Sequence, residues 1–360
     1  MIVAYFTFLG VFAVLLVISA AKHKKFEEAK QDSKLLTVII PFRNEEANLP
    51  GLIKSIQAQT VLPYEILFID DHSLDKGKEL LETVFLGKTF VSIISLPDSV
   101  EGKKGAIDFG VKLSTGDYCL TLDADVEFDK FFFECMLKKM NADMTIGAVI
   151  MKSDSFLSRL FSFEYMLFNA FNFSFSSFFV SSASGANLLF YKEKYFEVNS
   201  LPQHSALASG DDYFLLKDFQ HHSASIILNN HADNAVYTKS VGGWKDYFNQ
   251  RIRWLSKTKT TLNWKELVVG LALVVYLIGS FVLAIYLFYH NNFTLFYSLI
   301  GVRFLIDLFV YSNYTARLGI LKLFLIYPVF FVLYPFLFSA VVFGTFFYRP
   351  KWKGRGLVKK

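Results

Sequence analysis

The sequence is poor in cysteine, and its two thiols cannot form a disulfide framework. Cys119 and Cys135 are the only cysteines among 360 residues. Disulfide-stapled secreted domains use four or more cysteines, whereas buried free thiols are usual in reducing compartments. The seven histidines show no convincing zinc-ligand spacing and have no cysteine partners. We therefore expect neither a disulfide scaffold nor a zinc site.

A basic stripe interleaved with aromatic residues is also missing. The chain has 37 Lys and Arg against 32 Asp and Glu, a formal net charge of +5. Proteins that bind nucleic acids usually neutralise many phosphates with a continuous basic surface. Here the basic residues gather beside apolar segments instead, so we expect a membrane partner and no nucleic acid.

Apolar residues are abundant. The chain is 53% hydrophobic and 18% aromatic, with a mean hydropathy of +0.36, which exceeds the usual content of a soluble domain. Residues 2–20 carry no charge and are long enough to cross a hydrocarbon core of about 30 Å as a helix. Lys22, Lys24 and Lys25 follow this run, whereas the basic residues of a signal peptide precede its apolar core. We predict an uncleaved anchor over residues 1–21 and, by the positive-inside rule, a cytoplasmic domain after it.

The C-terminal third, residues 267–348, is predicted to be a transmembrane region. Two spans are expected over 267–288 and 293–312. The second span contains Arg303 and Asp307, which lie four residues apart and would share one face of a helix. They are expected to pair with each other or to point into the protein, and a functional role is the alternative.

The last apolar run, residues 319–348, is long for one span and contains Pro328 and Pro335. Proline interrupts helices, so this run predicts two short crossings or a re-entrant pair. The basic tail, residues 349–360, predicts a cytoplasmic C-terminus.

Residues 156–180 are nearly as apolar as a span but contain Arg159 and Glu164. If this stretch crossed the membrane, the acidic motifs before and after it would lie on opposite sides. We therefore expect a helix on the membrane surface or beneath the catalytic domain, within one cytoplasmic domain over residues 35–262.

Between the apolar ends, short β-rich runs alternate with helical ones. Strands are expected at LLTVII, EILFID, VSIISL and YCLTLDAD, with helices beginning near residues 46, 75 and 103. This βαβ series predicts an α/β domain with a mainly parallel sheet. Ligands of such sheets bind beyond the carboxyl ends of the strands.

Acidic residues follow three of these strands. Glu45 and Glu46 come after the first, Asp70 and Asp71 end the second, and Asp-Ala-Asp at 123–125 follows the fourth. Carboxylates at one sheet edge repel each other unless a cation lies among them. Each motif alone is weak, but their order and spacing predict a divalent metal site.

From Leu36 to Trp254 the chain resembles the family 2 glycosyltransferases of GT-A fold. The resemblance is to membrane-embedded members related to cellulose, chitin and hyaluronan synthases. It rests on seven segments: PFRNEE, FIDDHS, EGKKGAIDFG, TLDAD, SGANLLFYK, SGDDYFL and QRIRW. It implies transfer of a sugar from a nucleotide-diphosphate sugar, with UDP as the family default.

The resemblance also implies roles for individual residues. Asp212 would be the general base, and Asp125 with Asp123 would hold Mg²⁺ or Mn²⁺. The residues implied in donor binding are Pro41, Glu45, Asp71, Lys103, Asp123, Gln250, Arg253 and Trp254. Those implied in acceptor binding are Asn187, Asp211 and Trp254. The family more often has Glu where this chain has Asp211. Asn187 could instead hold a turn, and Trp254 could be an interfacial anchor.

These residue types suit sugar transfer. A divalent cation on oxygen ligands stabilises the departing diphosphate, and a carboxylate beside the acceptor hydroxyl takes its proton. One base and direct displacement predict inversion at the anomeric carbon. We expect a lipid-linked or polysaccharide acceptor at the cytoplasmic face of a bacterial-type cell membrane, with single addition and processive synthesis both open. A non-catalytic transporter or scaffold with a nucleotide-binding domain is the alternative. No motif in the spans indicates an oligomeric state.

Overall fold

The structure is a computed structural model, and it forms two compact units. It describes residues 1–22, 34–200, 210–258, 264–348, 351–352 and 355–356. We call Met1–Lys25, Ser153–Ser181 and Ser240–Pro350 the helical unit, and Phe26–Lys152, Ser182–Lys239 and Lys351–Lys360 the sheet unit. Lys24 and Lys25 of the predicted anchor flank, Ser209 of SGDDYFL and most of the basic tail lie outside the described residues.

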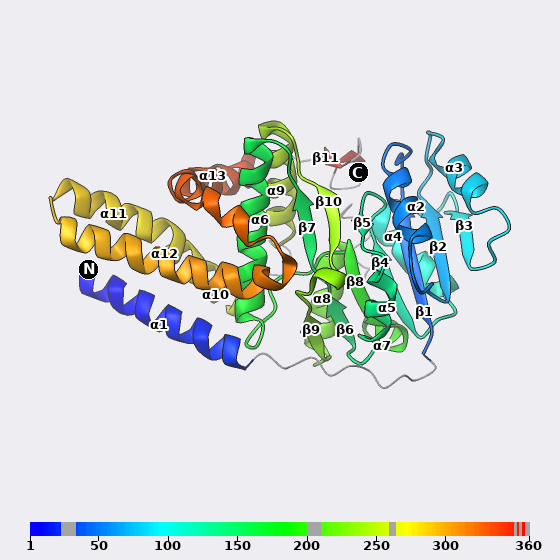
Figure 1. Cartoon of the computed structure of the whole chain (residues 1–360), viewed down its shortest axis with the longest axis horizontal. Coiled ribbons are helices and arrows are strands. Elements are labelled where there is room, and N and C mark those ends of the chain that lie inside the picture. Colours follow the sequence, from blue (N-terminus) through cyan, green and yellow to red (C-terminus); the bar gives the residue numbers. More distant parts are fainter. Residues whose placement is uncertain (23–33, 201–209, 259–263, 349–350, 353–354, 357–360) are drawn as a thin grey trace. The chain divides into compact units, whose positions relative to one another are not determined.

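The sheet unit is built on a seven-stranded, mostly parallel sheet in the order β3-β2-β1-β4-β8-β6-β9 (Figure 1). β1, β2, β3 and β4 pair in parallel, and β8 runs antiparallel to both β4 and β6. The strands are β1 (Leu36–Phe42), β2 (Glu65–Asp70), β3 (Val91–Ser95), β4 (Tyr118–Leu122), β6 (Met144–Ile146), β8 (Asn187–Tyr191) and β9 (Ile226–Leu228). The predicted strands and their parallel pairing are confirmed.

Three helices alternate with the first four strands, as the sequence predicts. They are α2 (Leu49–Gln57), α3 (Gly77–Val84) and α4 (Gly102–Leu113). Leu49, Leu52, Ile53 and Ile56 form the buried face of α2, because residues three and four apart share one side of a helix. The remaining helices of this unit are α5 (Phe132–Leu137), α7 (Lys192–Val198), α8 (Asp211–His221) and the short 3₁₀ turn η2 (Ala232–Asn234).

A second, three-stranded sheet also belongs to this unit. Its order is β5-β10-β7, with β5 (Glu127–Phe128), β10 (Val236–Lys239) and β7 (Val149–Lys152). β10 pairs with β7 in parallel and with β5 in antiparallel register. The two-residue strand β5 follows directly on the Asp-Ala-Asp segment, so this sheet fixes the position of the chain just after residue 125.

The helical unit contains four helices that are long and apolar enough to cross a membrane, among the residues that the structure describes: Ile2–Ala21, Glu266–Tyr289, Phe293–Leu318 and Leu321–Phe347. Its elements are α1 (Ile2–Ala21), α6 (Phe156–Phe175), α9 (Trp244–Thr258), α10 (Trp264–Val274), a π-helical turn η3 (Val275–Gly279), α11 (Ser280–Tyr289), α12 (Phe293–Thr315), η4 (Ala316–Leu318), η5 (Leu321–Ile326) and α13 (Tyr327–Phe347). α6 packs against α1 and α12 and ends at Phe175, before the expected limit of 180.

The expectation of two short crossings or a re-entrant pair over 319–348 is wrong, because Tyr327–Phe347 forms one continuous helix, α13, after the 3₁₀ turn η5. Pro328 lies in its first turn, where the missing N–H has no partner to lose. Pro335 lies inside the helix and removes one backbone hydrogen bond. The helix nevertheless continues to Phe347.

A polar cluster lies among the apolar helices. Arg303 donates from Nε to Asp307 Oδ2 at 2.9 Å and from Nη1 to the Ser280 hydroxyl at 2.9 Å. The hydroxyls of Tyr276 and Tyr327 each donate to Asp307 at 2.8 Å. Arg303 and Asp307 are 3% and 0% exposed, so the pairing expected from their spacing is present and fully covered.

The π-helical turn supports this cluster. The carbonyl of Tyr276, inside this turn, accepts from Arg303 Nη1 at 2.9 Å and from the Tyr5 hydroxyl at 3.2 Å. A π turn displaces the regular hydrogen-bond ladder and leaves carbonyls available to other donors. The cluster therefore ties α1, α11, α12 and α13 together through groups that are costly to bury alone.

Removing one partner of the cluster should be more harmful than removing both. Asp307→Ala leaves the Arg303 guanidinium buried without its counter-charge, and we expect a loss of about 3–5 kcal/mol in unfolding free energy. Thermal unfolding in detergent measures it as a clear fall in Tm. The Tm of the double variant Asp307→Ala with Arg303→Met should fall less than that of Asp307→Ala alone; an equal or larger fall would contradict the cluster.

Candidate functional site

The predicted site residues after β1 and β2 are held by a tight network. Asp71 is 2% exposed, and its Oδ1 accepts the backbone N–H of Gly102 at 3.0 Å. Arg43 donates to the carbonyl of Asp71 at 2.8 Å. Gly102 has a φ of 87°, a conformation that side chains disfavour. Asp71 thus fixes the start of α4, which carries Lys103.

Lys103 forms ion pairs with two carboxylates from separate segments of the chain, Asp123 and Asp211. Its Nζ lies 2.5 Å from Asp123 Oδ1 and 3.3 Å from Asp211 Oδ2. Burial alone would lower the pKa of Lys103, but Asp123, Asp211 and Asp212 raise it above its ordinary value. The ammonium therefore stays charged and balances part of the negative charge at this sheet edge.

The two carboxylates of Asp211 and Asp212 begin α8, directly after Gly210 in the left-handed region. Asp212 accepts from the backbone N–H of Tyr213 at 2.8 Å and of Gly185 at 3.4 Å. A Cβ on Gly185 would lie 2.6 Å from Asp211 Oδ2 and 3.1 Å from Lys103 Nζ. Gly185 is thus needed for the close approach of its backbone to both acidic residues.

Asp125 lies at the exposed edge of the same group. Its Oδ2 accepts from the Thr238 hydroxyl of β10 at 3.2 Å. The crowding of the carboxyl by surrounding protein, with the negative charges of Asp123 and Glu45, raises the pKa of Asp125 to about 6. Thr238 and Lys103 oppose this shift. Burial and the nearby negative charges therefore disfavour the ionised form of Asp125 at this position.

A divalent cation suits this arrangement. Within the described ranges, no group of three or more His, Cys, Asp or Glu residues is arranged as a complete metal cage. Asp123 and Asp125 supply only carboxylate oxygens, and Mg²⁺ commonly takes one or two carboxylates together with water and substrate phosphates. Such an ion would offset the repulsion between Asp125 and the negative charges of Asp123 and Glu45.

Asn187 lies inside the fold, at the start of β8. It is 0% exposed, and its side-chain amide donates to the carbonyls of Ala148 and Asn234 at 3.1 and 2.8 Å. A Cβ on Gly147 would lie 2.2 Å from this amide. These contacts favour the structural role of Asn187 over contact with an acceptor.

Gln250, Arg253 and Trp254 lie on α9 of the helical unit. The other predicted site residues lie in the sheet unit, so a common site with the QRIRW segment stays a prediction. Sequence reasoning did not identify Arg251 and Glu164, which form a buried ion pair of 2.7 Å beside these residues. The two are 87 positions apart, and no local spacing signals the contact.

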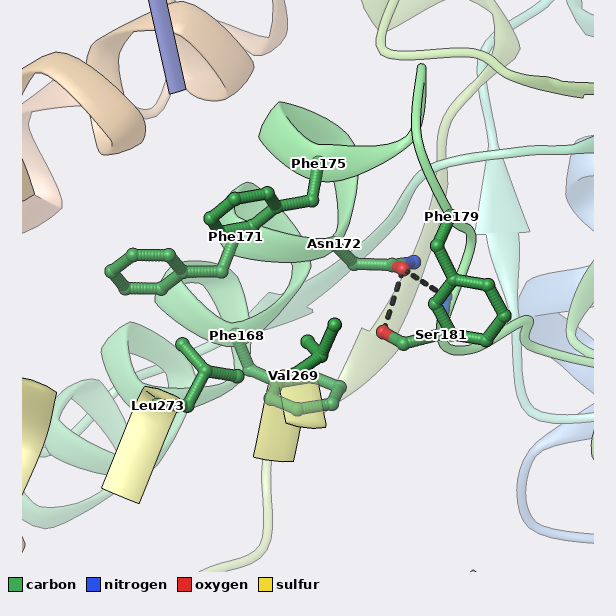
Figure 2. A pocket seen from close by; sticks show the side chains of 8 residues that line it. All are labelled: Phe168, Phe171, Asn172, Phe175, Phe179, Ser181, Val269 and Leu273. Carbon is green, nitrogen blue, oxygen red and sulfur yellow. Dashed lines mark hydrogen bonds between the residues drawn. The ribbon is translucent and has the colours of Figure 1, made fainter. Parts of the chain in front are cut away.

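A small groove in the helical unit contains none of the predicted site residues (Figure 2). Phe168, Phe171 and Phe175 of α6 line it with Val269 and Leu273 of α10. The carbonyl of the Asn172 side chain accepts from the Ser181 N–H and hydroxyl at 2.7 and 2.8 Å. With about 10 Å³ of enclosed space it has room for roughly one water molecule, so it is no sugar-nucleotide site.

Comparisons with known proteins agree with the fold. Residues 37–195 match the family described as Glycosyl transferase family 2. A 99-residue segment is 36% identical to an undecaprenyl-phosphate 4-deoxy-4-formamido-L-arabinose transferase from Aeromonas hydrophila and covers 27% of this chain. A transferase of the same name from Pectobacterium carotovorum is 37% identical over 99 residues, again 27% of this chain. The chain spans about 30% of the length of each of these relatives.

A solved structure is similar over almost the whole chain. The mannosyltransferase PcManGT from Pyrobaculum calidifontis, in complex with GDP-Man and Mn²⁺, has a TM-score of 0.54 and covers 96% of both chains. Its sequence identity is 13%, so it supports the GT-A fold with its flanking apolar helices, and no substrate.

The raised pKa of Asp125 predicts a stability change that depends on pH. The unfolded carboxyl titrates near 3.8 and the folded one near 6, so ionisation costs the metal-free fold stability as pH rises through this window, and the full cost is present above it. Asp125→Asn removes this cost. We expect the Tm of the metal-free variant to exceed that of wild type by a few degrees at pH 7.5 and by less at pH 5, measured by scanning fluorimetry with EDTA. An equal shift at both values would contradict the assignment.

Proposed function

We propose that the chain transfers a sugar from a nucleotide-diphosphate sugar to a lipid-linked acceptor at the cytoplasmic membrane face; the match of residues 37–195 to glycosyl transferase family 2 supports this proposal. The observation that carries the proposal is the convergence of Asp123, Asp211 and Lys103 at one edge of a GT-A sheet. A transporter or scaffold would have no need for this costly charge cluster.

The donor is proposed to bind where β1, β2 and β4 end. Pro41, Glu45 and Asp71 would contact the nucleotide, and UDP remains the family default. Lys103 is charged and is paired with Asp123. Its ammonium group can therefore bind diphosphate oxygens when the donor is present. Mg²⁺ or Mn²⁺ on Asp123 and Asp125, when bound, would supply positive charge to the leaving diphosphate.

Asp212 is proposed as the general base. The first turn of α8 and the N–H groups of Tyr213 and Gly185 surround its carboxylate, and these positive dipoles favour the ionised form. An ionised carboxylate can take the proton of the acceptor hydroxyl or phosphate during attack. Direct attack on the anomeric carbon would invert its configuration. Asp211, paired with Lys103, would border the acceptor side.

A lipid-phosphate acceptor is favoured over a polysaccharide by two observations. The two bacterial relatives described above are named as undecaprenyl-phosphate transferases, and the chain has four helices apolar enough to span a membrane. The relation to cellulose, chitin and hyaluronan synthases stays a prediction, as does transfer of a hexosyl or N-acetylhexosaminyl group, and single addition and processive synthesis both stay open.

We further propose that three of the four apolar helices cross: α1, the α10–α11 helix and α12. α13 packs against α9, and Val341 shares a core with Tyr247 and Ile252 of that helix. Figure 1 draws α6, α9 and α13 together at one end of the bundle of α1, α11 and α12. α9 is strongly charged, so helices beside it suit the membrane boundary. This would keep the C-terminal strands β11 (Lys351–Trp352) and β12 (Arg355–Gly356), which group with the sheet unit, on the cytoplasmic side.

Asp212→Asn tests the proposed chemistry. The amide keeps the shape but cannot take a proton, so we expect sugar transfer to fall by roughly 10²- to 10⁴-fold. The affinity for the nucleotide sugar, measured by calorimetry, should change little. Asp218→Asn, a carboxylate of the same helix that bonds Ser200, is the matched control and should retain transfer. Unchanged transfer by Asp212→Asn would contradict the proposal.

The three-crossing topology can be tested by labelling single cysteines in intact cells, in a Cys119→Ser, Cys135→Ser background. Asn291→Cys in the turn between α11 and α12 should react with a membrane-impermeant maleimide. Lys351→Cys should react only after the membrane is opened. Labelling of both in intact cells would show that α13 crosses.

A further inference from the structure

A buried ion pair in the helical unit contacts two residues of the QRIRW segment. The segment contains two arginines, and Arg251, the one that the QxxRW pattern leaves unspecified, is 7% exposed. Gln250, Arg253 and Trp254 are all only partly buried. Of the polar side chains of this segment, Arg251 is therefore the one that α9 turns inward, beside the buried Ile252.

Arg251 is held by two partners on α6. Its Nε donates to Glu164 Oε2 of α6 at 2.7 Å, and its Nη2 donates to the carbonyl of Phe161 at 3.2 Å. The other oxygen of Glu164 accepts from the Tyr247 hydroxyl at 3.0 Å. Both carboxylate oxygens of Glu164 are thus used, and its side chain is 13% exposed. A fully bonded pair of this kind holds its geometry because any shift strands a buried charge.

Arg251 also orients the side-chain amide of Gln250. Its Nη1 donates to Gln250 Oε1 at 2.6 Å. Arginine has no acceptor, so the contact forces the oxygen of the Gln250 amide toward the guanidinium. The amide nitrogen then points away from Arg251, and Gln250 offers N–H donors to a ligand. Such donors suit phosphate or hydroxyl oxygens.

Arg251 also contacts the aromatic residue of the segment. The centre of its guanidinium lies 4.5 Å from the centre of the Trp254 ring and 5.1 Å from that of Tyr247. Tyr165 of α6 lies 5.7 Å from the Trp254 ring. A planar guanidinium over an indole face is a favourable cation–π arrangement, and it fixes the plane of the ring.

We propose that Arg251 and Glu164 are positioning residues that set the Gln250 amide and the Trp254 ring for an oxygen-rich ligand, the donor diphosphate or the acceptor phosphate. This inference rests on the proposed function, since it gives Gln250 and Trp254 a substrate to meet. It also gives a role to the one glutamate of α6.

Arg251→Lys tests the proposal, because lysine keeps the charge but loses the fork and the stacking plane. We expect KM for the nucleotide sugar or for the polyprenyl phosphate to rise about tenfold. The variant combined with Gln250→Ala should be little worse than Gln250→Ala alone, since both disturb one arrangement. Glu164→Gln, which keeps one accepting oxygen, should lie between wild type and Arg251→Lys.

Arg303→Lys is the matched control. Arg303 belongs to the other buried ion pair of the helical unit and contacts neither Gln250 nor Trp254 in any interaction described above. It should lower Tm without changing either KM. If Arg251→Lys behaves like Arg303→Lys, the pair only stabilises the fold and the proposal is overturned, while the proposed function stands. If Gln250→Ala and Trp254→Ala leave both KM values unchanged, the segment meets no substrate and the proposal is also overturned; the Asp212→Asn test decides the proposed function separately.

Discussion

The gathering of carboxylates at one edge of a parallel sheet is the constraint on which the site depends. Asp123, Asp125, Asp211 and Asp212 come from two distant parts of the chain, and a partly buried cation, Lys103, lies among them. Like charges at such separation destabilise the fold unless a ligand or ion compensates them. Crowding by the surrounding protein, together with the negative charges of Asp123 and Glu45, raises the pKa of Asp125, and Lys103 offsets this shift only in part. The same imbalance makes the edge suitable for a cation and a diphosphate.

The scaffold around this edge is rigid where the charges are attached. Asp71 is bonded to the start of α4, Thr238 of the small sheet bonds Asp125, and Gly185 allows its backbone to approach Asp211 and Asp212. Each contact joins segments that are far apart in sequence. Preorganised groups of this kind lose little energy when the ligand arrives.

Much of the sheet unit could be predicted from the sequence, because periodicity and the position of acidic residues after strands are local signals. The strands from Leu36 to Leu122 and the buried face of α2 are as predicted. The pairing of Arg303 with Asp307 also follows from their spacing. The continuous α13 could not be predicted, because a proline in the first turn of a helix and a proline that breaks a helix look alike in sequence. The burial of Asn187 and the pair of Glu164 with Arg251 depend on long-range packing, which no local pattern records.

The helical unit shows how polar groups are accommodated among apolar helices. The two described ion pairs, Arg303 with Asp307 and Arg251 with Glu164, are both buried and bonded to tyrosines. The first ties apolar helices to each other, and the second holds α9 on α6. The pair of Arg303 with Asp307 stabilises the bundle, whereas we propose that the pair of Arg251 with Glu164 places substrate-binding side chains.

The site residues together support metal-assisted transfer of a sugar to a lipid phosphate. The most direct measurement incubates the purified chain in lipid and detergent with polyprenyl phosphate and a panel of nucleotide sugars, with Mn²⁺ or with EDTA, and analyses the lipid extract by mass spectrometry. We expect one glycosylated lipid to form with Mn²⁺ and none to form with EDTA. Release of nucleotide without any glycosylated lipid, or no turnover of any donor by folded protein, would contradict it.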